Sequence, residues 1–169
     1  MILAYLMAMV CLGVQAKKYR FDMEHPYRLE QVGASRHPGC KLVKVWGVAG
    51  NADKAIERAL QDAVAACIFE GLPEKPAAQT GESIGATYPL CREGRGAYES
   101  HKEWFDKFFK EGGFMDYVSN VNSAYPSGEN NVGFEGGRKV GIYAEVAYSE
   151  LRKLLEAEGI VRKMGINIQ

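Results

Sequence analysis

The fold is decided by residues 41–69, which read KLVKVWGVAGNADKAIERALQDAVAACIF. The first nine residues are rich in Val, Leu and Trp, which predicts a strand over Lys41–Ala49. Asn51 follows as an expected N-cap, because its side chain can accept a hydrogen bond from the first helical turn. The pattern then predicts a helix over Ala52–Phe69, which Gly71 and Pro73 end.

The predicted helix carries two apolar stripes at four-residue spacing. One stripe contains only small side chains: Ala55, Ala59, Ala63 and Cys67. The other contains only large ones: Ile56, Leu60, Val64 and Ile68. Small residues allow a helix to approach a sheet closely, and large ones fill the space beside it. The opposite face is polar and is expected to be solvated: Asp53, Lys54, Glu57, Arg58, Gln61 and Asp62.

Further along the chain, the pattern alternates between loops, helices and strands. It predicts a long loop over Leu72–Ala97, with a short strand over Ile84–Leu90, and then a helix over Ser100–Lys110 with a Ser100/Glu103 capping box. Two strands follow, over Phe114–Val121 and Arg138–Ala147, and a turn-rich link joins them. The last predicted element is a helix over Ser149–Glu158. We therefore expect an α+β domain over residues 41–169, with an antiparallel sheet of three to four strands and helices packed mainly on one face.

The first forty residues read differently from this domain. Residues 1–16 carry no charge and end in Val14-Gln15-Ala16, which is typical of a signal peptide and its cleavage site. The alternative is a buried N-terminal helix. Because no basic residue precedes the apolar run, we expect the true start to lie upstream or a basic region to have been lost. Val10 before Cys11 argues against a lipid anchor. Residues 17–40 are expected to form an extended N-terminal arm.

This pattern predicts a periplasmic or secreted protein, with no stable membrane span after cleavage because the apolar run is too short. The 169 residues include 21 basic and 21 acidic ones. A chain of zero net charge has no overall field to attract nucleic acid, so no nucleic-acid partner is predicted.

An exported domain can hold disulfides. Cys40 and Cys91 lie in loop-like sequence and are the expected pair, whereas Cys67 lies in the helical pattern and is expected in the core. The alternative, three free thiols, stays open at this point.

A family resemblance rests on the two ends of the predicted domain. The N-terminal part of this pattern contains Lys44-Val45-Trp46-Gly47, Asp62-Ala63-Val64 and Phe69-Glu70-Gly71-Leu72. The C-terminal part contains Lys139-Val140-Gly141-Ile142-Tyr143-Ala144-Glu145-Val146, Leu154-Leu155-Glu156 and Gly159-Ile160. Together they resemble uncharacterised secreted proteins of Gram-negative envelopes and, more distantly, the N-terminal domain of flagellar assembly protein T and related small outer-membrane lipoproteins. The resemblance implies an envelope-associated α+β domain, a scaffold or assembly module, and carries over no catalytic residues.

The polar residues form no recognisable catalytic or metal-binding motif. His25, His37 and His101 are isolated in the sequence, so no metal or cofactor site is predicted. The turn over residues 47–50 lacks the spacing of a phosphate-binding loop. No catalytic residue is assigned.

The aromatic residues of the segment 100–110 are the candidate partner-binding residues. Trp104 and Phe108 share one side of the predicted helix, and Phe105 and Phe109 share the next, so a single buried stripe does not hold them all. An exposed part could bind an envelope protein, a peptide or a glycan; the alternative is a wide buried face. The sequence thus favours a non-enzymatic binding or assembly module. The second hypothesis is a small periplasmic hydrolase or ligand-binding protein with a site built from scattered polar residues.

Overall fold

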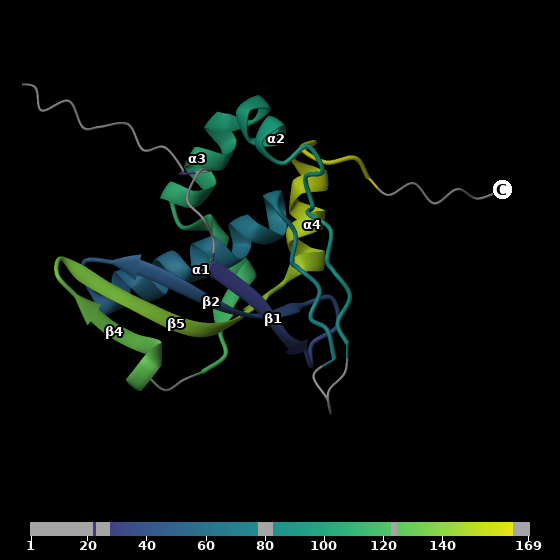
Figure 1. The fold of residues 1–169 in the computed structure, drawn as a ribbon. Coiled ribbons are helices and arrows are strands. Elements are labelled where there is room, and N and C mark those ends of the chain that lie inside the picture. Colours follow the sequence, from purple (N-terminus) through teal and green to yellow (C-terminus); the bar gives the residue numbers. More distant parts are fainter. Residues whose placement is uncertain (1–21, 23–27, 78–82, 123–124, 164–169) are drawn as a thin grey trace, which may run out of the picture.

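The computed structural model describes residue 22 and residues 28–77, 83–122 and 125–163. The chain forms an open antiparallel sheet with helices on one side of it (Figure 1). In chain order the elements are β1 (Arg28–Ala34), β2 (Lys41–Ala49), α1 (Ala52–Phe69), α2 (Arg95–Ser100), α3 (Lys102–Lys110), the 3-10 helix η1 (Gly113–Tyr117), β3 (Val118–Asn120), the 3-10 helix η2 (Gly128–Asn130), β4 (Asn131–Phe134), β5 (Gly137–Val146) and α4 (Tyr148–Ala157). The predicted α+β class is confirmed.

The sheet is built around β5. The strand order in the sheet is β1-β2-β5-β3. β3 and β4 both pair with the edge of β5 that faces away from β2, β4 near the start of β5 and β3 near its end. The described residues thus contribute five strands, where the sequence predicted three to four. The strand over Lys41–Ala49 has the predicted bounds. β3 and β5 are antiparallel neighbours. The sequence predicted this pairing for the strands on either side of the turn-rich link.

The two strands that the sequence did not predict are both at the edges of the sheet. β1 lies inside the segment that was expected to be an extended arm, and it pairs with β2 through a bulge between Gln31 and Gly33. β4 lies inside the turn-rich link and forms a hairpin with β5. Both are rich in polar residues or glycine, and pairing with a neighbouring strand, rather than intrinsic propensity, makes them strands.

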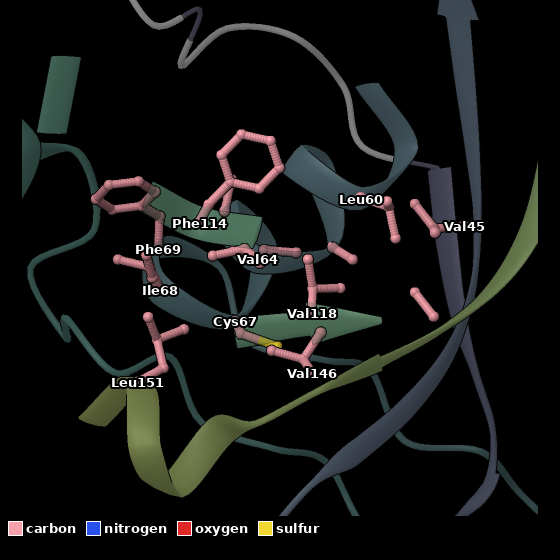
Figure 2. Packing of buried hydrophobic residues seen from close by; sticks show 14 of the residues in the cluster. Val45, Leu60, Val64, Cys67, Ile68, Phe69, Phe114, Val118, Val146 and Leu151 are labelled. Atoms are coloured by element: carbon pink, nitrogen blue, oxygen red, sulfur yellow. The ribbon is translucent and has the colours of Figure 1, made fainter. Parts of the chain in front are cut away.

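The core lies between α1 and the sheet. The small stripe of α1 is fully buried at Ala55, Ala59 and Ala63, and α1 begins as predicted, with the Lys54 N–H donating to Asn51 Oδ1 at 2.9 Å. Figure 2 shows Val64 and Cys67 of α1 close to Val118 and Val146 of the sheet. The polar face of α1 is solvated only in its first half, because Gln61 and Asp62 are buried.

Helix α3 begins two residues later than predicted. Ser100 ends the short helix α2, and His101 separates the two helices without a side-chain capping bond. The predicted Ser100/Glu103 capping box is therefore not formed. The segment predicted as a strand over Phe114–Val121 is a 3-10 turn followed by the three residues of β3. The short strand predicted over Ile84–Leu90 is reduced to single bridges to Lys75 and Leu72.

Candidate functional site

The candidate site lies on the outer face of the sheet, opposite α1. Side chains alternate along β2, so that Val43, Val45 and Gly47 are buried towards α1 while Lys44 and Trp46 are half-buried on the other face. The pairing register adds neighbours from both sides of β2. Arg28 of β1 lies opposite Trp46, and Tyr143 of β5 lies opposite Lys44. Three strands thus bring two cations and two aromatic rings together.

These four residues, Arg28, Lys44, Trp46 and Tyr143, form what we call the outer-face cluster. The Lys44 ammonium lies 4.9 Å from the centre of the Trp46 ring and 5.7 Å from that of Tyr143. The Arg28 guanidinium lies 5.1 Å from the centre of the Trp46 ring. Each cation is held by the negative face of a ring, which orients it without neutralising its charge.

A small cleft opens beside this cluster, where β5 passes between its two partner strands. β4 pairs with residues 137–140 of β5 and β3 pairs with residues 144–146, so Gly141, Ile142 and Tyr143 lie between them. Tyr143 O accepts a hydrogen bond from the Val121 N–H at 2.8 Å. The backbone polar groups of Tyr143, and of Gly141 two residues earlier, therefore face this side.

The walls of this cleft are mostly neutral polar side chains. It has a volume of about 160 Å³ and is lined by Asn120, Asn122, Tyr125, Ser127 and Asn130, with Tyr143 beside them. We call it the asparagine cleft. Pockets that bury drug-sized ligands measure roughly 300–1,000 Å³. The asparagine cleft is therefore large enough for one ring or one side chain, and further ligand contacts have to come from the outer-face cluster.

Gly141 joins the cluster to the cleft. A Cβ at this position would lie 2.8 Å from Trp46 Nε1 and 3.1 Å from Asn130 Oδ1. The indole edge of Trp46 therefore lies across Gly141, next to the amide of Asn130. A side chain at residue 141 would displace the indole and narrow the cleft.

A second cavity, of about 260 Å³, lies between β1 and the loop after α1. Two of its polar side chains hold that loop in place: the Gln31 amide donates to the carbonyls of Pro73 and Gly85, and Lys75 Nζ donates to Val32 O at 2.8 Å. These bonds fix the loop against the edge of β1, so we assign this cavity a structural role.

Ser35, His37 and Glu145 meet at the turn between β1 and β2. Ser35 Oγ donates to Glu145 Oε1, and His37 Nδ1 lies 2.7 Å from Glu145 Oε2. These two bonds lower the pKa of Glu145. In a hydrolytic triad the imidazole bridges the serine and the carboxylate. Here the carboxylate is the bridge, so the cluster ties the turn to β5 and does not have the geometry that activates a serine.

The three cysteines in the described residues, Cys40, Cys67 and Cys91, are free thiols. The pairing expected between Cys40 and Cys91 is not present, and the structure has the alternative of three thiols. Burial raises the pKa of Cys67 to about 12 and, together with the nearby Glu93 carboxylate, that of Cys91 to about 12. Burial also raises the pKa of Cys40. Reactive cysteines require a lowered pKa, whereas burial raises the pKa of all three thiols.

The structure places three of the four candidate aromatic residues of α3 in the core. Phe105, Phe108 and Phe109 are buried, and Trp104 is half-buried with its ring stacked on Phe108 at 4.9 Å. Phe105 also packs against Phe69 of α1, with ring centres 4.8 Å apart. This is the wide buried face that the sequence left open. Buried rings are not available to a partner, so α3 is not our candidate site.

Asp62 of α1 is a buried carboxyl group that the sequence placed on the solvated side. Its Oδ1 lies 3.0 Å from Arg58 Nε. Burial raises the pKa of Asp62 to about 7, although the Arg58 charge acts in the opposite direction. The carboxyl group is fully buried, so its effect is expected on stability.

The pKa of Asp62 predicts a pH dependence of unfolding. Between about pH 4, where a carboxyl group titrates in an unfolded chain, and pH 7, the folded state holds a proton that the unfolded state has lost. The free energy of unfolding should therefore fall as pH rises through this range, by up to about 4 kcal/mol. Asp62→Asn should remove that slope, as measured by urea unfolding at pH 5 and pH 8. An unchanged slope in the variant would contradict the assignment.

Comparison with known proteins adds no family to this description. No protein-family model, no curated protein and no solved structure matches the chain. Within the described ranges, no helix is both long and apolar enough to cross a membrane. The same ranges contain no group of three or more His, Cys, Asp or Glu residues placed to hold a metal ion. The case for a function therefore rests on the outer-face cluster and the asparagine cleft.

Proposed function

We propose that this protein is an exported, non-enzymatic binding module of the cell envelope that holds its ligand on the outer face of its sheet. Export rests on the predicted signal peptide, residues 1–16, which lie outside the described residues. The envelope setting, and a scaffold or assembly role, rest on the resemblance described above. The binding role rests on the outer-face cluster.

The main support for the proposal is that the outer-face cluster places aromatic and cationic side chains together on a face of the sheet that does not form the hydrophobic core. The core is complete on the other side of the sheet, where Val43, Val45, Val140 and Val146 are fully buried against the helices. Aromatic residues and arginine are the residues most enriched at the centres of binding sites. The asparagine cleft at the neighbouring edge of β5 supplies directional hydrogen bonds.

The alternative of a small hydrolase would need a nucleophile and a base that converge. Ser35, His37 and Glu145 come closest to this arrangement, but their order is wrong for proton transfer from Ser35 to His37. The outer-face cluster contains no carboxylate or imidazole that could serve as a general base. A binding role therefore fits the geometry better than this alternative.

The test is retention of envelope components by the purified protein. Trp46→Ala combined with Tyr143→Ala should reduce retention at least about tenfold, which corresponds to the roughly 1.4 kcal/mol or more that a residue at the centre of a site contributes. Quantitative mass spectrometry and sugar analysis of the bound fraction would measure it. The matched control is Tyr88→Ala, because Tyr88 is an aromatic residue 78% exposed outside the cluster.

The double variant must keep its fold for this comparison to count, which near-ultraviolet circular dichroism and urea unfolding would show. If the folded double variant retains the same components as the wild type, the outer-face cluster is not the binding site. If Tyr88→Ala loses them instead, binding takes place elsewhere on the surface.

A further inference from the structure

We infer that the ligand of the outer-face cluster and asparagine cleft is a glycan that carries carboxylate groups. This inference rests on the proposed function and names the chemical class of ligand for the same site. Three features support it: the two cations, the neutral amides of the cleft and the flat aromatic walls.

The two cations are available to an anionic group. Among the described residues, no ion pair involves Arg28 or Lys44, although Glu30 lies opposite Lys44 in the pairing register. The two cations are on neighbouring strands, β1 and β2, and lie beside the same indole ring. The distance to the centre of the Trp46 ring is 5.1 Å from Arg28 and 4.9 Å from Lys44. A carboxylate bound at either cation would receive charge-assisted hydrogen bonds from it.

The asparagine cleft suits the hydroxyl groups of a sugar. Asn120, Asn122 and Asn130 each offer an amide that both donates and accepts hydrogen bonds, as a sugar hydroxyl does. Asn120 Oδ1 already accepts from the Asn122 N–H at 3.2 Å, which helps to fix the turn that carries both amides. A volume of about 160 Å³ limits the cleft to one ring, so a longer chain would continue over the outer-face cluster.

The aromatic walls complete the match. The C–H groups on one face of a sugar ring carry partial positive charge, and the negative faces of aromatic rings attract such groups. Tyr143 lines the asparagine cleft and also belongs to the outer-face cluster. A sugar in the cleft would therefore contact Tyr143 while its carboxylate reaches Lys44.

Other polymers fit this face less well. Nucleic acid needs several cations along its phosphates, whereas the outer-face cluster has only Arg28 and Lys44, and the whole chain has no net charge. A peptide that adds a strand needs a long open edge, whereas the stretch of β5 between its partner strands is only Gly141–Tyr143, and Tyr143 O already accepts from the Val121 N–H. An acidic glycan requires neither a long row of cations nor a long open strand edge.

The experiment is calorimetric titration of the purified full chain with four probes. They are trigalacturonic acid, the neutral trisaccharide maltotriose, a ten-residue poly-glutamate peptide and a ten-nucleotide oligothymidine. Trigalacturonic acid should bind at least about tenfold more tightly than each of the other three, and its affinity should fall as salt is raised because exposed charges are screened. Equal or tighter binding of any other probe, or no binding of trigalacturonic acid, would overturn the inference.

Two variants and one control test the residues. Lys44→Gln should lower the affinity for trigalacturonic acid about tenfold or more while keeping the side-chain stem, and Gly141→Ala should lower it by displacing Trp46 and narrowing the cleft. Lys107→Gln removes an exposed cation of α3 and should change nothing. If Lys44→Gln binds like the wild type, the carboxylate contact is wrong.

The proposed function and the glycan inference can fail separately. If wild type retains envelope components and the Trp46 and Tyr143 variant does not, but trigalacturonic acid fails to bind, the glycan inference is overturned and the proposed function stands. If that variant retains the components, the proposed function fails and the inference fails with it.

Discussion

Gly47→Ala is expected to destabilise the fold by more than about 3 kcal/mol, a large part of the 5–15 kcal/mol that typically separates folded from unfolded domains. A Cβ at residue 47 would lie 1.9 Å from Ala55 O and 2.6 Å from Ala59 N. Both atoms belong to the backbone of α1, so no side chain can move aside. The helix would have to separate from β2 along its length. Urea unfolding followed by circular dichroism measures the loss.

Gly50→Ala is the matched control for this prediction. Gly50 lies three residues further along, and a Cβ there would meet no atom within 4 Å. Its substitution should change the free energy of unfolding by less than about 1 kcal/mol. From the helix side, Ala59→Leu should also destabilise the fold by overpacking, but by less, at about 1–3 kcal/mol. A Gly47→Ala protein as stable as Gly50→Ala would mean that α1 does not pack directly on β2.

Phe105→Ala is expected to cost about 3–5 kcal/mol, the usual range for removing a buried phenylalanine. Phe105 is fully buried, and its ring packs against Phe69, Tyr98 and Trp104. The cavity would open at the contact between α3 and α1, among the rings of Phe69, Tyr98 and Trp104. Thermal and urea unfolding measure the loss.

The same variant separates the two interpretations of the α3 aromatic residues. A residue whose role is to bind a partner would leave stability nearly unchanged when truncated, as surface substitutions do. Trp104→Ala, at the half-buried end of the set, should cost clearly less than Phe105→Ala. Near-wild-type stability of Phe105→Ala would restore the binding interpretation of α3.

The sequence predicted the centre of the fold well because local signals there agree with one another. Alternating apolar residues, the Asn51 cap and the small stripe of Ala55, Ala59 and Ala63 all favour one arrangement, and the structure has it. The edge strands β1 and β4 could not be predicted in this way. Their residues become strands through pairing with β2 and β5, which is tertiary information.

The candidate site was missed for a related reason. Lys44 and Trp46 were assigned to a strand, but the two faces of that strand were not distinguished from the sequence. What the sequence does not contain is the register that places Arg28 opposite Trp46 and Tyr143 opposite Lys44. The α3 aromatic residues are clustered in the sequence, but whether they are covered depends on Phe69 and Tyr98, which lie elsewhere in the chain.

The central claim is that the ligand contacts the outer face of the sheet and not α3. The most direct test is photo-crosslinking in cells with p-benzoylphenylalanine in place of Tyr143, on the outer face, or of Lys107, on the exposed side of α3. The account predicts a crosslinked adduct from position 143, lost when Trp46→Ala is added, and none from position 107. An adduct from position 107 with none from position 143 would contradict it.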